Sequence, residues 1–91
     1  MSAKRVFITG GASGLGRALA NRFADAGYWV CIGDVDDGRG AEALAELQAK
    51  TTAHYCNCDV TKESALQTVA DWLLSEWGGV DVVVNNAGVA S

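Results

Sequence analysis

The stretch FITGGASGLGRAL, residues 7–19, decides the fold of this chain. It starts as an apolar strand, passes through a glycine-rich turn and continues with leucines at helical spacing. Gly10, Gly14 and Gly16 have the spacing G-x-x-x-G-x-G. Because glycine lacks a Cβ, such a loop can turn tightly, approach a pyrophosphate closely and let the next helix pack on the strand. The amino terminus of that helix then offers N–H groups to an anion.

An acidic residue follows this loop at an informative distance. Asp34 ends the second strand-like run, close to the roughly 20-residue offset at which a carboxylate binds the adenosine ribose of a dinucleotide. The glycine triplet alone leaves simple turn chemistry open, and Asp34 could also be a helix cap or a solvated turn residue. We favour the dinucleotide interpretation because the two features occur together.

The rest of the chain alternates between two kinds of segment. Apolar or period-two runs predict four strands, at Arg5–Thr9, Trp29–Gly33, Ala53–Cys58 and Val80–Asn85. Three stretches between them have helical spacing. The first carries Leu15, Leu19 and Phe23 inward and stops at Gly27.

The two later helices have their own signals. The second is expected to start at Asp36 or Asp37 and to bury Ala41, Leu44 and Leu47. For the third we expect a cap at Thr61, an end at Gly78–Gly79 and one apolar stripe, made of Leu66, Val69, Ala70, Leu73 and Trp77. Trp72 and Trp77 are interpreted as packing residues.

This β-α-β-α-β-α-β order predicts an α/β fold with a parallel sheet, because each parallel return needs a right-handed crossover. We expect a partial Rossmann-like, three-layer fold in which four strands lie in the order 3-2-1-4 with three crossover helices. We expect residues 1–91 to form a single domain, truncated relative to a complete fold. A ligand crevice is expected at the carboxyl ends of the strands, where the strand order reverses.

Composition excludes several classes of function. Of the residues, 49% are hydrophobic and 20% charged, and the net charge is −4. This charge argues against nucleic acid as a partner. The apolar run near the start is too short for a signal peptide or a membrane span, so we expect a cytoplasmic protein without a membrane partner.

The three cysteines, Cys31, Cys56 and Cys58, lie in or beside apolar runs. An odd number suits a reducing compartment better than a disulfide framework. The stretch HYCNCD, residues 54–59, could be read as metal ligands, but Cys-x-Cys without a second cluster is poor zinc spacing. We expect structural thiols and no metal.

Three motifs give a family resemblance that covers nearly the whole chain. TGGASGLG (residues 9–16), CDV (58–60) and NNAG (85–88) fall in this order at the ends of the first, third and fourth predicted strands. Together they closely resemble the short-chain dehydrogenase/reductase family. The resemblance implies the NAD-binding portion of an oxidoreductase that interconverts an alcohol and a ketone or aldehyde by hydride transfer.

The resemblance also implies a role for particular residues. Asp34 would hold the adenine ribose, while Asp59 and Val60 would lie along the adenine; a cap or turn role for Asp59 stays open. The pyrophosphate would be lined by Gly10, Ser13, Leu15 and Gly16, with Gly14 permitting the turn, and the ribose would be bordered by Asn85, Ala87 and Gly88.

NAD is expected as the cofactor rather than NADP, for a reason of charge. A 2′-phosphate near Asp34 would meet a carboxylate, and Asp36 and Asp37 make that neighbourhood more negative. NADP-preferring relatives usually have a basic residue where this chain has Ser13 or Val35. Like-charge contact is an effective way to reject the wrong ligand.

The family's catalytic pattern is not found in this sequence. Hydride transfer there relies on a Ser and on a Tyr followed four residues later by a Lys, which lowers the tyrosine pKa. Here Tyr28 is followed by Ile32 and Tyr55 by Asp59. We therefore expect residues 1–91 to be inactive alone. The alternative function is a catalytically inactive NAD-binding or assembly module, with a homodimer formed through the edge of the fourth strand or through bare sheet faces.

Overall fold

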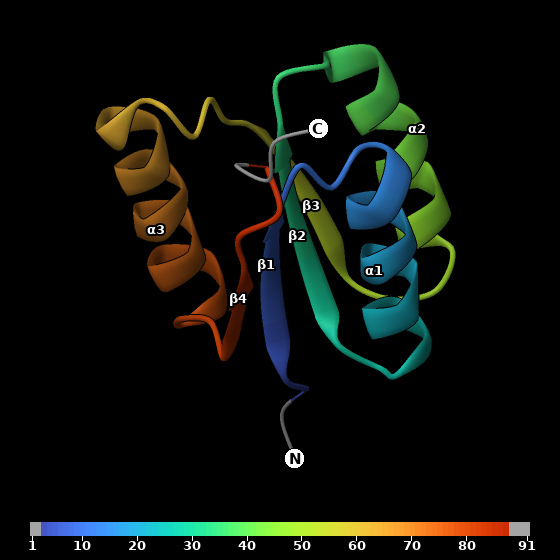
Figure 1. The fold of residues 1–91 in the computed structure, drawn as a ribbon. Coiled ribbons are helices and arrows are strands. Elements are labelled where there is room, and N and C mark those ends of the chain that lie inside the picture. Colours follow the sequence, from blue (N-terminus) through green and yellow to red (C-terminus); the bar gives the residue numbers. More distant parts are fainter. Residues whose placement is uncertain (1–2, 88–91) are drawn as a thin grey trace.

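The computed structural model describes residues 3–87 and consists of one sheet between helices (Figure 1). The strands are β1 (Arg5–Thr9), β2 (Trp29–Asp34), β3 (Ala53–Asn57) and β4 (Val82–Val84), and the helices are α1 (Gly14–Asp25), α2 (Asp37–Gln48) and α3 (Glu63–Trp77). All strand pairs are parallel, and the order is β3-β2-β1-β4. The predicted fold class and strand order are confirmed.

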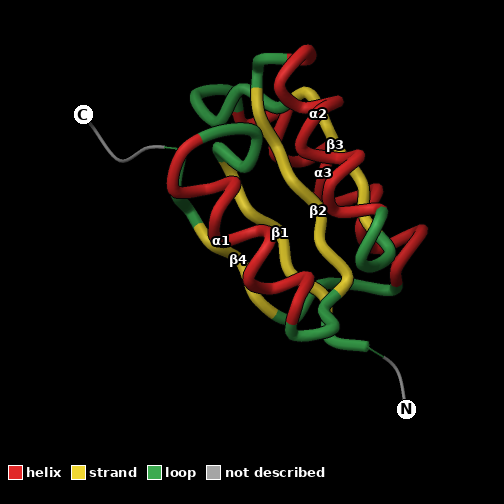
Figure 2. The backbone as a smooth tube through the Cα atoms, turned by 90° about the vertical axis from the view of Figure 1, so that its right-hand side faces the viewer, coloured by secondary structure: helices red, strands yellow, loops and turns green. Residues whose placement is uncertain are grey.

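The helices divide the molecule into three layers. Helices α1 and α2 cover one face of the sheet, and α3 covers the other (Figure 1). The view turned by 90° looks onto the face with α1, with the strands running behind it (Figure 2). Successive strand residues point to opposite faces, so β1 serves both layers: Val6 and Ile8 pack under α1 and α2, whereas Phe7 packs under α3.

Three of the predicted strands have bounds that differ from the expectation. β4 is shorter than predicted at both ends. At its start, Asp81 accepts hydrogen bonds from the backbone N and the guanidinium of Arg5, at 2.8 and 3.0 Å, so the chain is still completing a turn there. At its end, Thr9 Oγ1 takes up the N–H groups of Asn86 and Ala87. β3 ends at Asn57, one residue before Cys58, and β2 continues to Asp34.

Helix α1 buries smaller residues than its leucines predict. Gly16, Ala20 and Ala24 face the sheet, while Leu19 and Phe23 are half-buried beside them and Leu15 is 67% exposed. The stripe is therefore rotated by one position, because small residues let the helix lie close to the strands. The predicted stop is confirmed: Gly27 has a φ of +87°.

Helices α2 and α3 confirm some of the predicted positions and correct others. Asp36 caps α2 by accepting from Arg39 N at 3.0 Å, and Leu47 is buried, but Ala41 is exposed and Ala43 is buried in its place. Thr61 does not cap α3. The N-cap position of α3 is occupied by Lys62, whose side chain makes no cap hydrogen bond. The Thr61 hydroxyl donates to Asp59 Oδ1 instead.

The predicted apolar stripe of α3 is buried only along its centre. Val69 and Leu73 are buried, Trp77 is half-buried, and Leu66 and Ala70 are exposed. The helix ends as expected at Gly78, whose φ of +76° is left-handed. Trp77 packs edge-on against Trp29 and Trp72, which supports the interpretation of both α3 tryptophans as packing residues.

The three cysteines are free thiols on the α3 side of the sheet. Cys31 and Cys58 are buried, Cys56 is half-buried, and the Sγ atoms of Cys31 and Cys56 are 3.9 Å apart. The hydrogen bond with Cys56 and then burial raise the pKa of the Cys31 thiol. Within residues 3–87, no three His, Cys, Asp or Glu side chains are grouped so that they could hold a metal ion. The helices of this part of the chain are too short or too polar to cross a bilayer.

Candidate functional site

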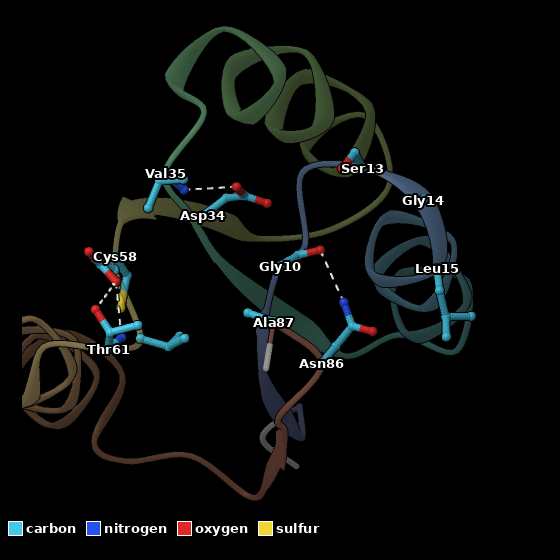
Figure 3. A pocket seen from close by; sticks show the side chains of 12 residues that line it. Gly10, Ser13, Gly14, Leu15, Asp34, Val35, Cys58, Thr61, Asn86 and Ala87 are labelled. Carbon is cyan, nitrogen blue, oxygen red and sulfur yellow. Dashed lines mark hydrogen bonds between the residues drawn. The ribbon is translucent and has the colours of Figure 1, made fainter. Parts of the chain in front are cut away.

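An open crevice of about 700 Å³ lies at the carboxyl ends of the strands. The strand order reverses beside β1, which is the place where ligands bind in open parallel sheets. Residues from four segments converge there (Figure 3), and the lining consists of Gly10, Ser13, Gly14, Leu15, Asp34, Val35, Cys58, Asp59, Val60, Thr61, Asn86 and Ala87.

The glycine loop has the geometry that the sequence predicts. Gly10 and Gly14 have φ values of +67° and +56°, where other residues are strained. The loop is tied to β2 because Gly10 N and Gly11 N both donate to Gly33 O, at 2.7 and 3.3 Å. Gly16 does not line the crevice. It packs closely against two groups beside the crevice, since a Cβ there would overlap the Gly10 carbonyl and the Asn86 amide.

The amino terminus of α1 opens into this crevice. Ser13 is the N-cap in extended conformation, but its side chain makes no cap hydrogen bond. The first helical bond in this turn runs from Arg17 N to Ser13 O, at 3.2 Å. The first-turn N–H groups of Gly14, Leu15 and Gly16 therefore have no acceptor within the helix, and the helix dipole adds a positive end. This arrangement suits an anion.

Asp34 lies beside the glycine loop and lines the crevice, and backbone groups fix its carboxylate (Figure 3). Oδ2 accepts from Ala12 N at 3.1 Å, and Oδ1 accepts from Val35 N at 2.8 Å and Asp36 N at 3.3 Å. The turn role that the sequence left open is therefore real. It does not exclude ligand binding, because an ionised carboxylate has about four lone-pair sites and Asp34 lines the crevice.

Asp59 has a similar double position on the α3 side. Its Oδ1 accepts from the Thr61 hydroxyl at 2.7 Å and from Thr61 N at 3.0 Å. These two hydrogen bonds lower the pKa of the Asp59 carboxyl. The residue thus shapes the turn into α3 and, together with Cys58 and Val60, forms one wall of the crevice.

The segment after β4 completes the crevice. Thr9 Oγ1 accepts from Asn86 N and Ala87 N, both at 2.9 Å, and Asn86 Nδ2 donates to Gly10 O at 3.3 Å. Asn85 lies outside the set of lining residues within 3–87, and its Oδ1 is 3.3 Å from Thr9 Oγ1. Gly88, which the sequence also predicts for the site, falls outside the described residues.

Four lining residues were missed as site residues by the sequence analysis: Val35, Cys58, Thr61 and Asn86. Cys58 and Asn86 belong to the quoted motifs CDV and NNAG, so position within the motif is the signal that could have found them. Val35 follows Asp34 directly and is 61% exposed in the crevice wall. Thr61 was taken for a helix cap, and the signal that could have placed it is Asp59 two residues earlier, the spacing of a turn closed by an Asp side chain.

Fold and crevice together define a Rossmann-like nucleotide-binding fold. The family model described as short chain dehydrogenase matches residues 4–91. The chain therefore belongs to the short-chain dehydrogenase family, as the three motifs indicated.

Known proteins similar to this chain are consistent with that family. Zerumbone synthase of Zingiber zerumbet is 37% identical over 89 residues, which are 98% of this chain and 33% of that protein. NAD⁺-bound xylitol dehydrogenase superposes with a TM-score of 0.90 at 31% identity, covering 94% of this chain and 34% of that one.

A second solved structure carries the other dinucleotide. L-sorbose reductase from Gluconobacter frateurii, complexed with NADPH and L-sorbose, superposes with a TM-score of 0.92 at 33% identity, covering 100% of this chain and 35% of that one. This chain spans about a third of the length of such relatives. Solved relatives thus hold NAD⁺ or NADPH.

Proposed function

We propose that the crevice binds NAD, and that the chain is the dinucleotide-binding portion of a short-chain dehydrogenase/reductase that interconverts an alcohol and a ketone or aldehyde. One observation carries the proposal. Gly16 lacks the Cβ that would fill the space against the Gly10 carbonyl, and this close packing aims the open amino terminus of α1 at a crevice that faces Asp34. The loop fits a pyrophosphate, and the carboxylate fits ribose hydroxyls.

The site residues then have separate tasks in binding. The backbone of Gly10, Ser13 and Leu15 would meet the pyrophosphate, with Gly14 permitting the turn and Gly16 the close packing. Asp34 would accept from the adenine ribose, and Asp59 and Val60 would lie along the adenine. Asn85, Ala87 and Gly88 would border the second ribose. The bound dinucleotide supplies the hydride acceptor or donor; these residues bind and orient it.

Calorimetric titration of the 91-residue protein with NAD, followed by an alcohol-oxidation assay on the same sample, tests this function. We expect saturable binding without turnover, because neither tyrosine is followed four residues later by a lysine. An absence of heat at millimolar NAD contradicts dinucleotide binding. Turnover by these residues alone contradicts the inactive, binding-only role.

The preference for NAD over NADP is the finer part of the proposal. Asp34 lines the crevice, Ser13 stands where a basic residue would favour a 2′-phosphate, and Asp36 and Asp37 follow. We expect NAD to bind at least about tenfold more tightly, which is about 1.4 kcal/mol. An Asp34→Asn variant should narrow the gap because the charge is gone, although its single amide oxygen can replace only one of the two acceptors, the one for Ala12 N or the one for Val35 N and Asp36 N. Equal affinities of the unaltered protein for the two dinucleotides would sink this preference.

A second candidate function, self-association, is favoured by the surface beside β4. An apolar groove of about 160 Å³ lies between α3 and β4, and Leu74, Val83 and Leu66 are 67%, 60% and 37% exposed there. Within residues 3–87, β4 pairs only with β1 and leaves its other edge open, and such edges invite pairing.

We propose a homodimer through this edge and groove. Sedimentation should show a dimer whose population rises with protein concentration, and Val83→Lys should disperse it while leaving NAD binding unchanged. A strictly monomeric protein at high concentration contradicts the dimer.

The free thiols of Cys31, Cys56 and Cys58 further support a reducing, cytoplasmic location.

A further inference from the structure

The turn between β2 and α2 carries two crevice residues, Asp34 and Val35, and is exposed from Val35 to Arg39. Backbone groups hold the turn in part, because Val35 N and Asp36 N donate to Asp34 Oδ1 and Cys58 N donates to Asp34 O at 2.9 Å. Its further side-chain anchors come from β3, the neighbouring edge strand, whose Tyr55 and Asn57 both reach the turn.

The Tyr55 hydroxyl contacts the turn from β3. It lies 3.0 Å from the backbone oxygen of Asp34 and 2.7 Å from Asp37 Oδ1, so its single hydrogen has two acceptors within reach. The ring can take this path only because position 40 is glycine: a Cβ there would lie 2.5 Å from Cε1 and Cζ of Tyr55. Burial and the Asp37 carboxylate raise the pKa of Tyr55, so the phenol keeps its hydrogen at neutral pH.

Asn57 adds a second anchor on the same carboxylate. Its Nδ2 donates to Asp37 Oδ1 at 2.9 Å and lies 3.5 Å from the backbone oxygen of Val35. The hydrogen bonds from Asn57 and then Tyr55 lower the pKa of Asp37. Asp37 is thus held as a charged carboxylate in the first turn of α2.

This charge stands where an anion would otherwise find a helix end. The amino terminus of a helix attracts phosphate, and α2 begins only three residues after the carboxylate that we assign to the adenosine ribose. Asp36 Oδ1 accepts from Arg39 N, one of the N–H groups of that terminus, and Asp37 adds a second negative charge. A 2′-phosphate next to Asp34 would therefore meet carboxylates instead of a free helix terminus.

We propose that Tyr55 and Asn57 are positioning residues for the adenosine end of the dinucleotide, and that through Asp37 they set the rejection of a 2′-phosphate. This inference rests on the proposed NAD site. The two β3 side chains keep Asp34 and Val35 in the crevice wall and keep the Asp37 carboxylate at the start of α2.

The first test compares Tyr55→Phe with Tyr28→Phe, a matched control whose ring packs against Phe23 in the core away from the crevice. Loss of one hydrogen bond is worth about 1 kcal/mol, so Y55F should bind NAD about fivefold more weakly and keep its NADP affinity. Y28F should change neither by more than about twofold. The proposal is overturned if Y55F binds NAD like the wild type, or if both affinities fall by the same factor as a general loss of structure would cause.

A second variant isolates the charge. Asp37→Asn keeps an oxygen for Tyr55 and Asn57 but removes the negative charge, so NADP should bind about fivefold more tightly while NAD changes less than about twofold. Asp71→Asn, on the exposed side of α3, removes the same charge elsewhere and should leave the ratio unchanged. If D37N and D71N have the same ratio of NAD affinity to NADP affinity, Asp37 does not set the rejection of a 2′-phosphate.

Amide exchange of the ligand-free proteins separates this inference from the proposed function. In Y55F, the amides of Val35 and Asp36, which donate to Asp34 Oδ1, should exchange about fivefold faster, while that of Ile32 in β2 stays unchanged. Unchanged exchange at Val35 overturns the positioning role whether or not NAD binds. If the wild type binds neither dinucleotide, the cofactor role falls together with the proposed function.

Discussion

The two faces of the sheet are covered to different degrees. Under α1 and α2, eight residues form a core in which none is more than 3% exposed: Val6, Ile8, Ala20, Ala24, Val30, Ile32, Ala43 and Leu47. Under α3, the core has only five buried members, and Leu66, Leu74 and Val83 stay at the surface. The first face is closed, while the second leaves large apolar side chains exposed.

The residues that stabilise the fold most therefore lie on a different face of the sheet from the exposed apolar residues. Burial stabilises by roughly 25 cal/mol per Å² of apolar surface removed from water, and the closed face has already realised that gain. The crevice uses both faces, because the glycine loop enters α1 on one side and Asp59 and Val60 lead into α3 on the other. Substitutions can therefore address the closed face, the crevice and the open face one at a time.

The largest expected effect compares the two faces directly. Leu47→Ala, on the closed face, removes a side chain that is fully buried and should lower the free energy of unfolding by about 2–5 kcal/mol. Leu74→Ala, on the open face, removes a side chain that is 67% exposed and should change it by no more than about 0.5 kcal/mol. Urea unfolding of both variants measures this. Similar losses would mean that the open face is covered in solution.

A smaller effect is expected where α1 meets the crevice. Gly16→Ala places a methyl group against the Gly10 carbonyl and the Asn86 amide, so overpacking should destabilise the protein by about 1–3 kcal/mol and weaken NAD binding. Gly38→Ala is the matched control in α2, because its Cβ would meet only Asp36 Oδ1 at an ordinary 3.5 Å. It should be neutral or stabilise by up to about 1 kcal/mol. If the two variants bind NAD with equal affinity, the close packing at Gly16 does not shape the binding site.

The sequence predicted the strands and their order because both depend on signals that local residues carry. Apolar runs, glycine stops and the alternation with helices sufficed for β1, and the three motifs indicated the crevice. The predicted inward face of α1 was correct only in part. Leu19 and Phe23 pack half-buried against the core, but Leu15 is exposed, and contact distance favours Gly16, Ala20 and Ala24. Hydrophobicity does not report how closely two backbones approach.

The parts of the site that could not be predicted depend on long-range hydrogen bonds. Thr9 meets Asn86 and Ala87 across most of the chain, and Tyr55 meets Asp37 across a strand boundary. A polar side chain at a strand end has several partners available to it, and only the folded arrangement decides among them. The contact between Asp59 and Thr61 is different, because it spans only two residues and is the local turn that an Asp side chain favours.

Thr9 offers the next test, on the crevice side of the comparison. Its side chain is buried, and replacement by the similarly shaped valine leaves Asn86 N and Ala87 N without their acceptor. Each lost hydrogen bond costs about 1 kcal/mol, so Thr9→Val should unfold at lower denaturant concentration. Thr9→Ser keeps the hydroxyl and should lose less. Equal stabilities of the valine and serine variants would show that the segment after β4 is held by other contacts.

The smallest effect concerns an ion pair on the outside of the closed face, where α1 and α2 meet. Arg17 donates to both carboxylate oxygens of Glu46, with Arg17 Nε at 3.1 Å from Oε1 and Nη2 at 2.6 Å from Oε2. Hydrogen bonds from Arg17 and then Asn21 lower the pKa of Glu46 from 4.5 to about 2. The folded protein therefore holds this proton less tightly than the unfolded chain does. Its contribution to stability is complete above about pH 4.5 and is lost as the pH falls toward about 2.

Thermal unfolding between pH 7 and 2 measures that contribution. Glu46→Gln should lower the melting temperature slightly at pH 7 and flatten its decline below pH 4.5, with the difference shrinking in high salt. Some decline should remain, because Asp37, Asp59 and Asp81 also have lowered pKa values in the folded state. Glu63→Gln, exposed at the start of α3, is the control with the same change of charge. If both glutamine variants follow the same acid profile, the exposed ion pair adds nothing, and the closed face depends on its apolar core alone.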